Sequence, residues 1–168
     1  MMAKRLRFLI IKNITREGPG LIEAVLKENR ISYRILDLSK KPAPLPHPRN
    51  YDALIVMGGP DSVNDQTPKM RMLLRGVSEC LQEGKPCLGI CLGMQALVKA
   101  AGGKVTRSPY KEVGFYGPDR RNFTVELTRA GKRDPLFQKV LSPFRVFQLH
   151  GETALFDAQA KLLGKGKF

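Results

Sequence analysis

The sequence is poor in the features that would point to a membrane protein, a disulfide-stabilised protein or a zinc protein. Among its 168 residues there are two histidines, three cysteines and no tryptophan. Its apolar runs are all far shorter than the roughly 20 residues that a membrane-spanning helix needs. The N-terminal run RFLIIK has only the length of a strand, and no small-residue cleavage site follows it, so we expect a first strand and not a signal peptide. These absences predict a soluble protein without a membrane partner.

The three cysteines give no sign of a disulfide framework. Cys80, Cys87 and Cys91 cannot all pair with one another, and their spacing fits neither a zinc site nor a CxxC redox motif. We therefore expect a reduced protein in the cytoplasm, with no metal ion and no other cofactor. For Cys80 and Cys87 a place in the core is favoured over chemistry, because unreactive cysteines behave as small apolar residues.

Acidic residues are scarce, since 15 Asp and Glu stand against 29 Lys and Arg, which gives a net charge of +14. The basic surplus lies in residues 1–50 and 104–145, whereas residues 51–103 carry equal numbers of both signs. An excess of this size makes a polyanion such as nucleic acid a partner to consider. However, no basic run is interleaved with aromatic residues and no nucleic-acid-binding motif is present, so solvated surfaces are favoured and nucleic acid is not the expected partner.

The first third of the chain has the pattern of a βαβ unit. Short branched apolar runs at residues 7–11, 33–38 and 53–59 are bounded by turn residues, as buried parallel strands are. Between the first two runs, residues 18–30 repeat apolar side chains at helical spacing, at Leu21, Ile22, Val25 and Leu26. Residues 40–50 hold four prolines and predict an extended loop before the third strand.

The alternation of strands and helices continues to residue 103. Residues 69–84 predict a second amphipathic helix, residues 85–90 a fourth strand, and residues 91–103 a third helix that ends at paired glycines. This alternation predicts a three-layer α/β fold with a mostly parallel sheet and helices on both faces, in a single domain over residues 1–168. Beyond residue 103, short runs predict added strands and one helical turn, at residues 104–108, 112–116, 123–128, 134–140 (the turn) and 144–150.

The stretch LGICLG places Cys91 where the fourth strand becomes the third helix. Gly89 lies two residues before it and Gly93 two residues after it, as a sharp strand-to-helix corner requires. Free N–H groups at a helix N-terminus stabilise a thiolate, so Cys91 is a candidate nucleophile. The N–H of Leu92 would offer one donor to the oxyanion that forms when the thiolate attacks a carbonyl.

A second donor is predicted in the stretch MGGPDS, which follows the third strand. A glycine pair followed by proline is by itself usually a turn. Because the carboxyl ends of neighbouring parallel strands share one crevice, Gly59 and Cys91 are expected to face the same ligand. With the corner at Cys91 on the next strand, the pair becomes a candidate oxyanion hole.

Five stretches resemble, in order, successive motifs of the class I glutamine amidotransferases: MGGPDSVND, GICLGMQAL, AAGGKV, KEVGF and VFQLHGET. The resemblance covers nearly the whole chain and is greatest to the free-standing branch similar to the amidotransferase domain of GMP synthase. It implies the flavodoxin-like amidotransferase fold, hydrolysis of the glutamine side-chain amide through a cysteine thioester, and delivery of ammonia, in some cases to a partner synthase.

The resemblance also assigns roles by position. It implies Cys91 as the nucleophile, the N–H groups of Gly59 and Leu92 as the oxyanion hole, and a substrate-binding set of Gly58, Gln95, His150 and Gly151. No metal ligand is implied.

The sequence departs from the family at the general base, which the family places on a histidine in a later motif similar to FHPE. His47 lies in the proline-rich loop, where a surface role is expected. His150 is followed two residues later by Glu152, but its surroundings match the earlier substrate-side motif. We therefore expect a C-terminally truncated amidotransferase domain with impaired catalysis.

Two other functions stay open at this stage. One is a non-catalytic amidotransferase-fold protein whose basic surface binds an acidic partner or RNA. The other, an α/β-hydrolase with a cysteine nucleophile, is disfavoured because no acid and histidine follow Cys91 in convincing contexts.

Overall fold

The structure is a computed structural model that describes residues 6–155 and 160–166. Two compact units form, one within Met1–Val105 and one within Thr106–Phe168. Each unit has its own sheets. That both units belong to one domain of 168 residues stays a prediction.

The first unit is built on a four-stranded sheet in the order β2-β1-β3-β4. Its strands are β1 (Arg7–Lys12), β2 (Ser32–Asp37), β3 (Ala53–Val56) and β4 (Cys87–Gly89), and every neighbouring pair is parallel. All four residues of β3 are buried, as expected for an inner strand that is covered on both faces. The predicted parallel sheet is confirmed.

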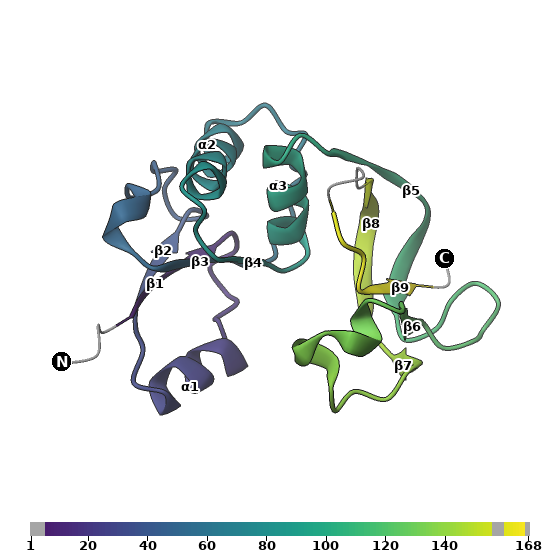
Figure 1. The fold of residues 1–168 in the computed structure, drawn as a ribbon. Coiled ribbons are helices and arrows are strands. Elements are labelled where there is room, and N and C mark those ends of the chain that lie inside the picture. The colour runs from purple at the N-terminus through teal and green to yellow at the C-terminus, as the bar shows by residue number, and fades with distance from the viewer. Residues whose placement is uncertain (1–5, 156–159, 167–168) are drawn as a thin grey trace. The chain divides into compact units, whose positions relative to one another are not determined.

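Three helices cover this sheet. Figure 1 shows α1 (Leu21–Glu28) on one side of the sheet and α2 (Pro68–Gln82) and α3 (Leu92–Ala100) on the other. The start of α2 is fixed locally, because the Thr67 hydroxyl accepts a hydrogen bond from the Met70 N–H at 3.2 Å. The predicted arrangement of helices on both faces is confirmed.

The core beneath α1 is small. Leu26 of α1 packs on Ile10 and Ile55 of the sheet, and Ile22 adds a partly buried side chain. The other two residues of the predicted apolar face point away from it, since Leu21 is 85% and Val25 53% exposed. The apolar stripe of α1 is therefore wider than the surface that the sheet offers it in this unit.

The proline-rich loop packs against α2. The side chain of Leu45 is buried and lies against Gly76, where a Cβ would come within 2.7 Å of it. A short 3₁₀ helix (Pro48–Asn50) follows, and the His47 ring accepts a hydrogen bond from the Arg49 N–H at 3.3 Å. His47 is exposed, as predicted.

The second unit contains a strand pair and a three-stranded sheet. The pair is β5 (Lys104–Gly114) with β8 (Gln148–Leu155). The three-stranded sheet has the order β7-β6-β9, and both of its strand pairs are antiparallel. Its strands are β6 (Thr124–Leu127), β7 (Phe144–Arg145) and β9 (Gly164–Gly166).

Two details of the second unit differ from the sequence pattern. The runs at residues 104–108 and 112–116 predict separate strands, but β5 continues through both, with Pro109 inside it. The helical turn predicted at residues 134–140 is a short 3₁₀ helix, Pro135–Phe137, and a second one, Gly131–Arg133, precedes it. Within residues 6–155 and 160–166, no helix is both long enough and apolar enough to cross a membrane.

Candidate active site

Cys91 lies at a tight corner between β4 and α3. Its backbone has φ 53° and ψ −115°, a left-handed φ that non-glycine residues seldom adopt. Two hydrogen bonds hold the corner, since the Ile90 N–H donates to the Val56 carbonyl at 3.0 Å and the Gly93 N–H donates to the Ile90 carbonyl at 2.9 Å. The Cys91 side chain is exposed. Backbone strain of this kind persists where the surrounding structure enforces it, and it clusters at functional sites.

The flanking glycines let α3 pack directly on the strands. A Cβ on Gly93 would lie 1.9 Å from the Val56 carbonyl oxygen, and one on Gly89 would lie 2.5 Å from the Gly93 carbonyl oxygen. Neither position has room for any side chain. The predicted corner with glycines on both sides therefore has a steric cause.

The glycine pair after β3 lies beside this corner. A Cβ on Gly58 would be 3.4 Å from the Cys91 Cβ and 3.9 Å from its Sγ, and one on Gly59 would be 3.1 Å from the Leu92 side chain. The structure thus brings Gly58, Gly59, Cys91 and Leu92 together at the carboxyl ends of β3 and β4, where parallel sheets bind ligands.

Two backbone N–H groups at this place have no partner within the described part of the chain. Neither the Gly59 N–H nor the Leu92 N–H has an acceptor among the residues that the structure describes. Gln95 lies on the first turn of α3, is 5% exposed, and donates its N–H to the Cys91 carbonyl at 3.1 Å. A thiol beside two unpaired N–H groups is the arrangement that acyl transfer needs.

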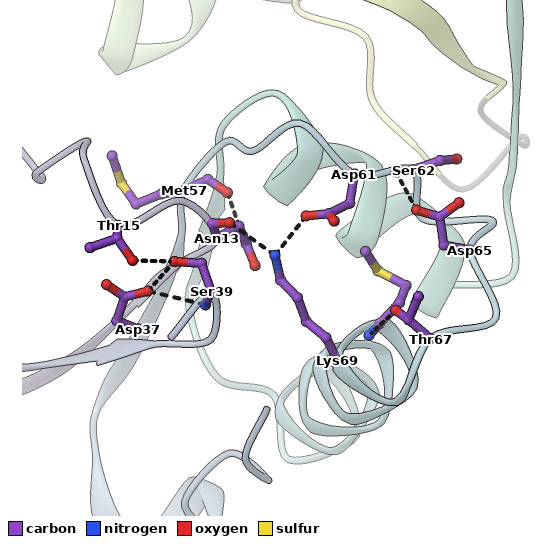
Figure 2. Close-up of polar contacts among 11 residues, drawn as sticks. Asn13, Thr15, Asp37, Ser39, Met57, Asp61, Ser62, Asp65, Thr67 and Lys69 are labelled. Carbon is purple, nitrogen blue, oxygen red and sulfur yellow. Dashed lines mark hydrogen bonds and ion pairs between the residues drawn. The ribbon is translucent and has the colours of Figure 1, made fainter. Parts of the chain in front are cut away.

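A polar cluster contacts the loop from Met57 to Asp61, called here the glycine loop. The Asn13 Nδ2 donates to the Met57 carbonyl at 2.9 Å, and the Lys69 ammonium donates to the Asn13 carbonyl at 2.9 Å and to the Asp61 carboxylate at 2.6 Å (Figure 2). Asn13 and Lys69 were not predicted from the sequence. No local motif marks them, because the Asn13 contacts with Met57 and Lys69 join residues 44 and 56 apart in the chain.

A second network joins the ends of β1 and β2 (Figure 2). The Thr15 and Ser39 hydroxyls lie 2.7 Å apart, and the Ser39 hydroxyl donates to the Asp37 carboxylate at 2.5 Å. Partial burial disfavours the charged carboxylate, but hydrogen bonds from Ser39 and Thr15 together with the charge of Lys12 outweigh it and lower the pKa of Asp37. This network fixes the loop that follows β1.

His150 and Gly151 belong to the second unit. The His150 Nε2 lies 2.8 Å from the Glu112 carboxylate and 3.0 Å from the Gln148 side-chain oxygen. Glu112 is 8% exposed, so the carboxylate that His150 contacts is largely buried. The neighbouring groove has a volume of about 510 Å³ and is lined by Arg107, Ser108, Pro109, Lys111, Gly151 and Glu152.

Several known proteins are similar to this chain. The sequence profile described as Glutamine amidotransferase class-I matches residues 20–162. The chain belongs to the class I glutamine amidotransferase family. It is 31% identical over 127 residues, 73% of its length, to the glutamine amidotransferase-like protein YfeJ of Salmonella typhimurium, of which it covers 50%. It is 35% identical over 146 residues, 86% of its length, to the glutamine-hydrolyzing GMP synthase of Thermotoga maritima, of which it covers 22%. The chain therefore spans half or less of these two relatives.

Solved amidotransferase structures have the same fold. The chain matches a glutamine amidotransferase from Methylobacillus flagellatus with a TM-score of 0.81 and 28% identity, over 96% of this chain and 61% of that one. It matches one from Thermotoga maritima with a TM-score of 0.82 and 27% identity, over 96% and 67%. The class I amidotransferase fold expected from the sequence motifs is confirmed.

The other two cysteines of this amidotransferase chain are shielded. Cys80 is fully buried and lies 2.8 Å from the Tyr51 hydroxyl, and burial raises its pKa. Cys87 is half-buried, and burial together with the nearby Cys80 raises its pKa to about 11. Burial confirms the predicted core place of Cys80. Of the three thiols, Cys91 is the exposed one.

The part of the chain that the structure describes holds no group of three or more His, Cys, Asp or Glu side chains that could bind a metal ion. The substrate-binding roles of Gly58, Gln95, His150 and Gly151 stay predictions.

Proposed function

We propose that this chain attacks the side-chain amide of glutamine with the Cys91 thiol and stabilises the resulting oxyanion with the N–H groups of Gly59 and Leu92. The observation that carries the proposal is the exposed Cys91 on a strained corner, beside two backbone N–H groups that have no acceptor among the described residues. Backbone donors that are fixed before the reaction stabilise developing charge without reorganising.

The proposed reaction has two steps. The thiolate attacks the amide carbon, a C–S bond forms, and the carbonyl oxygen becomes an oxyanion; collapse then breaks the C–N bond, and the nitrogen takes a proton and leaves as ammonia. Water next attacks the thioester, which releases glutamate and returns the thiol. Both steps need a proton carrier. We propose that neither His47 nor His150 serves as an efficient one, so that this chain acylates more readily than it turns over.

The names of the relatives favour a partner enzyme that accepts the ammonia. Similar chains include glutamine-hydrolyzing GMP synthases and the glutamine-hydrolyzing GMP synthase chain of Sulfurisphaera tokodaii, which is 42% identical over 67 residues, 40% of this chain and 34% of that one. We propose a cytoplasmic synthase partner that uses the ammonia. Glutamine is the proposed substrate.

A role for the second unit in binding glutamine is proposed from the resemblance alone. There, the backbone of His150 and Gly151 receives the amino-acid end of glutamine.

The test is a labelling experiment with a diazoketone analogue of glutamine, followed by peptide mass spectrometry. We expect Cys91 to be modified at least about tenfold faster than either other thiol, because only the thiolate reacts and Cys80 and Cys87 are shielded. L-Glutamine should slow the labelling of Cys91, and Cys91→Ala should leave the protein unlabelled. Preferential modification of Cys80 or Cys87 would sink the assignment. Tight RNA binding that weakens steeply with salt, without labelling of Cys91, would favour the non-catalytic alternative.

A further inference from the structure

Asn13 follows β1 directly and has a buried side-chain amide that belongs to none of the motifs. The residue is 1% exposed, and its Nδ2 reaches across to the end of β3 to donate to the Met57 carbonyl at 2.9 Å. The Met57 N–H is also tied to β1, because it donates to the Ile11 carbonyl at 2.9 Å. Both backbone polar groups of Met57 are therefore held, the N–H by Ile11 of β1 and the carbonyl by Asn13 just after it. Met57 immediately precedes a glycine whose backbone would otherwise have many conformations.

Asn13 also limits the position of Gly59. A Cβ built on Gly59 would come within 2.6 Å of the Asn13 Cβ, so the two backbones lie in close contact. Asn13 thus contacts the glycine loop on both sides of Gly58. Through the Met57 carbonyl it restrains the peptide before Gly58, and through its own Cβ it restrains the residue after it.

Lys69 of α2 holds the far end of the same loop. Its ammonium lies 2.9 Å from the Asn13 carbonyl and 2.6 Å from the carboxylate of Asp61, two residues beyond Gly59. The Lys69 side chain is 13% exposed, so water competes little for these bonds. Figure 2 shows Lys69 pointing between Asn13 and Asp61, so that one cation joins the end of β1 to the end of the loop.

The Asn13 amide is not placed for stability alone. Its Oδ1 is buried and has no donor among the described residues. An unsatisfied buried acceptor is unfavourable, and a leucine of similar shape would avoid it. What the amide supplies and leucine cannot is the hydrogen bond to the Met57 carbonyl.

We infer that Asn13, supported by Lys69, is a positioning residue for the oxyanion hole: it fixes the loop from Met57 to Asp61 so that the Gly59 N–H stays beside Cys91. The inference rests on the proposed function. Oxyanion donors must be held within about 0.5 Å of the productive geometry. Removal of one such donor slows acyl transfer about 10²- to 10³-fold, so a loosened donor should cost part of that factor.

The experiment measures acylation by the γ-(4-nitrophenyl) ester of L-glutamate on the full chain. The thiolate forms a C–S bond, the C–O bond breaks, and 4-nitrophenolate leaves without needing a proton, so the burst of 4-nitrophenolate reports Cys91 and the oxyanion hole and not a general acid. Alkylation of Cys91 by iodoacetamide is the companion measurement. There the thiolate displaces iodide from an sp³ carbon, and no oxyanion forms.

We expect Asn13→Leu and Asn13→Asp to slow the burst about 10- to 100-fold, while the iodoacetamide rate at Cys91 stays within about twofold. Asn13→Leu keeps the Cβ that contacts Gly59 and removes only the amide. Asn13→Asp keeps the shape but turns an acceptor toward the Met57 carbonyl. Lys69→Met should slow the burst by a smaller factor, since it removes the support and not the hydrogen bond to Met57.

Two matched controls come from α1. Asn29 donates its Nδ2 to the Val25 carbonyl at 2.8 Å on an exposed helix end, and Lys27 pairs with Glu23 at 2.8 Å on the surface. Asn29→Leu and Lys27→Met remove the same chemical groups, and both should leave both rates unchanged. Thermal melting of each variant shows whether it is folded. If Asn13→Leu does not fold, the burst and iodoacetamide rates of the near-isosteric Asn13→Asp and of Lys69→Met test the positioning role.

Several outcomes overturn the inference. A burst in folded Asn13 variants as fast as in the wild type would refute the positioning role and leave the proposed function intact. An equal fall of the burst and the iodoacetamide rate would place the effect on the thiol and not on the oxyanion hole. A wild-type burst no larger than that of Cys91→Ala would refute the proposed function, and the inference with it.

Discussion

Gly93→Ala is a substitution that the backbone packing of the structure forbids directly. A Cβ at this position would lie 1.9 Å from the Val56 carbonyl oxygen and 2.6 Å from the Val56 carbonyl carbon. Real Cβ atoms essentially never approach other heavy atoms within 3.0 Å. The start of α3 would therefore have to move away from β3 by about 1 Å or more, and no side chain at the contact can give way, because both neighbouring atoms belong to the backbone.

The cost follows from what that movement disturbs. Overpacking of a dense core costs about 1–3 kcal/mol. The Val56 carbonyl also accepts the Ile90 N–H at 3.0 Å, and weakening this bond between β3 and the corner adds about 1 kcal/mol. The free energy of unfolding should fall by about 2–4 kcal/mol. At about 2–4 °C per kcal/mol for a chain of this size, the melting temperature should fall by about 4–16 °C.

Circular dichroism melting curves measure the fall in melting temperature, and alanine substitutions at two other glycines serve as controls. Gly18 has nothing within 4 Å of a built Cβ, so Gly18→Ala should leave stability unchanged or raise it by up to about 1 kcal/mol. Gly76 meets only the flexible Leu45 side chain, so Gly76→Ala should fall between the two. Hydrogen exchange of peptides from β3 and α3 would localise the loss.

The steric clash at Gly93 also has a chemical consequence. Because the displaced helix start carries Cys91 and Leu92, Gly93→Ala should lose the preferential labelling of Cys91 by the glutamine analogue. A melting temperature for Gly93→Ala within a degree or two of that for Gly18→Ala would refute the reasoning, since it would mean that α3 does not pack on β3 as described.

Two further predictions concern proton transfer. We expect the chain to release ammonia from glutamine barely faster than Cys91→Ala, because neither His47 nor His150 stands in a motif like that of the family's base; robust release that both Cys91→Ala and His150→Ala abolish would contradict this. Because burial raises the pKa of Cys87 to about 11 from its ordinary value of 9.0, its alkylation at pH 8 should run at about a thousandth of its plateau rate and rise tenfold per pH unit. Between about pH 9 and 11 the folded state keeps the Cys87 proton that the unfolded chain loses, so the contribution of Cys87 to the free energy of unfolding is complete below about pH 9 and is lost toward pH 11. An alkylation rate of Cys87 that stayed flat between pH 7 and 10 would argue against the raised pKa.

The parts of the site that the sequence predicted are those in which backbone geometry demands glycine. The corner at Cys91 has no room for a side chain at Gly89 or Gly93, and Gly59 has none either, because a Cβ there would lie 2.6 Å from the Asn13 Cβ. The parallel sheet then places both segments at one edge by a general rule of topology. Local pattern and topology were sufficient for these residues.

The supporting residues could not be predicted because their roles depend on tertiary contacts. Asn13 is 44 residues from Met57, and Lys69 is 56 from Asn13. An asparagine after a strand and a lysine in the first turn of a helix are ordinary in any sequence. The pattern was also misleading for α1, where the four apolar residues predicted one buried face, but the sheet covers only Ile22 and Leu26.

The two backbone N–H donors of the proposed oxyanion hole differ in how readily a substitution can remove them. Nineteen of the twenty amino acids carry the same N–H group, so at the proposed donors only proline can erase it. At Gly59 proline is barred by the contact with Asn13, which leaves no room even for a Cβ. At Leu92, the first residue of α3, proline suits the helix geometry, because the first N–H of a helix has no partner within it. In the proposed site, Leu92 is therefore the donor that proline can remove while keeping the helix geometry, at the cost of a buried leucine side chain.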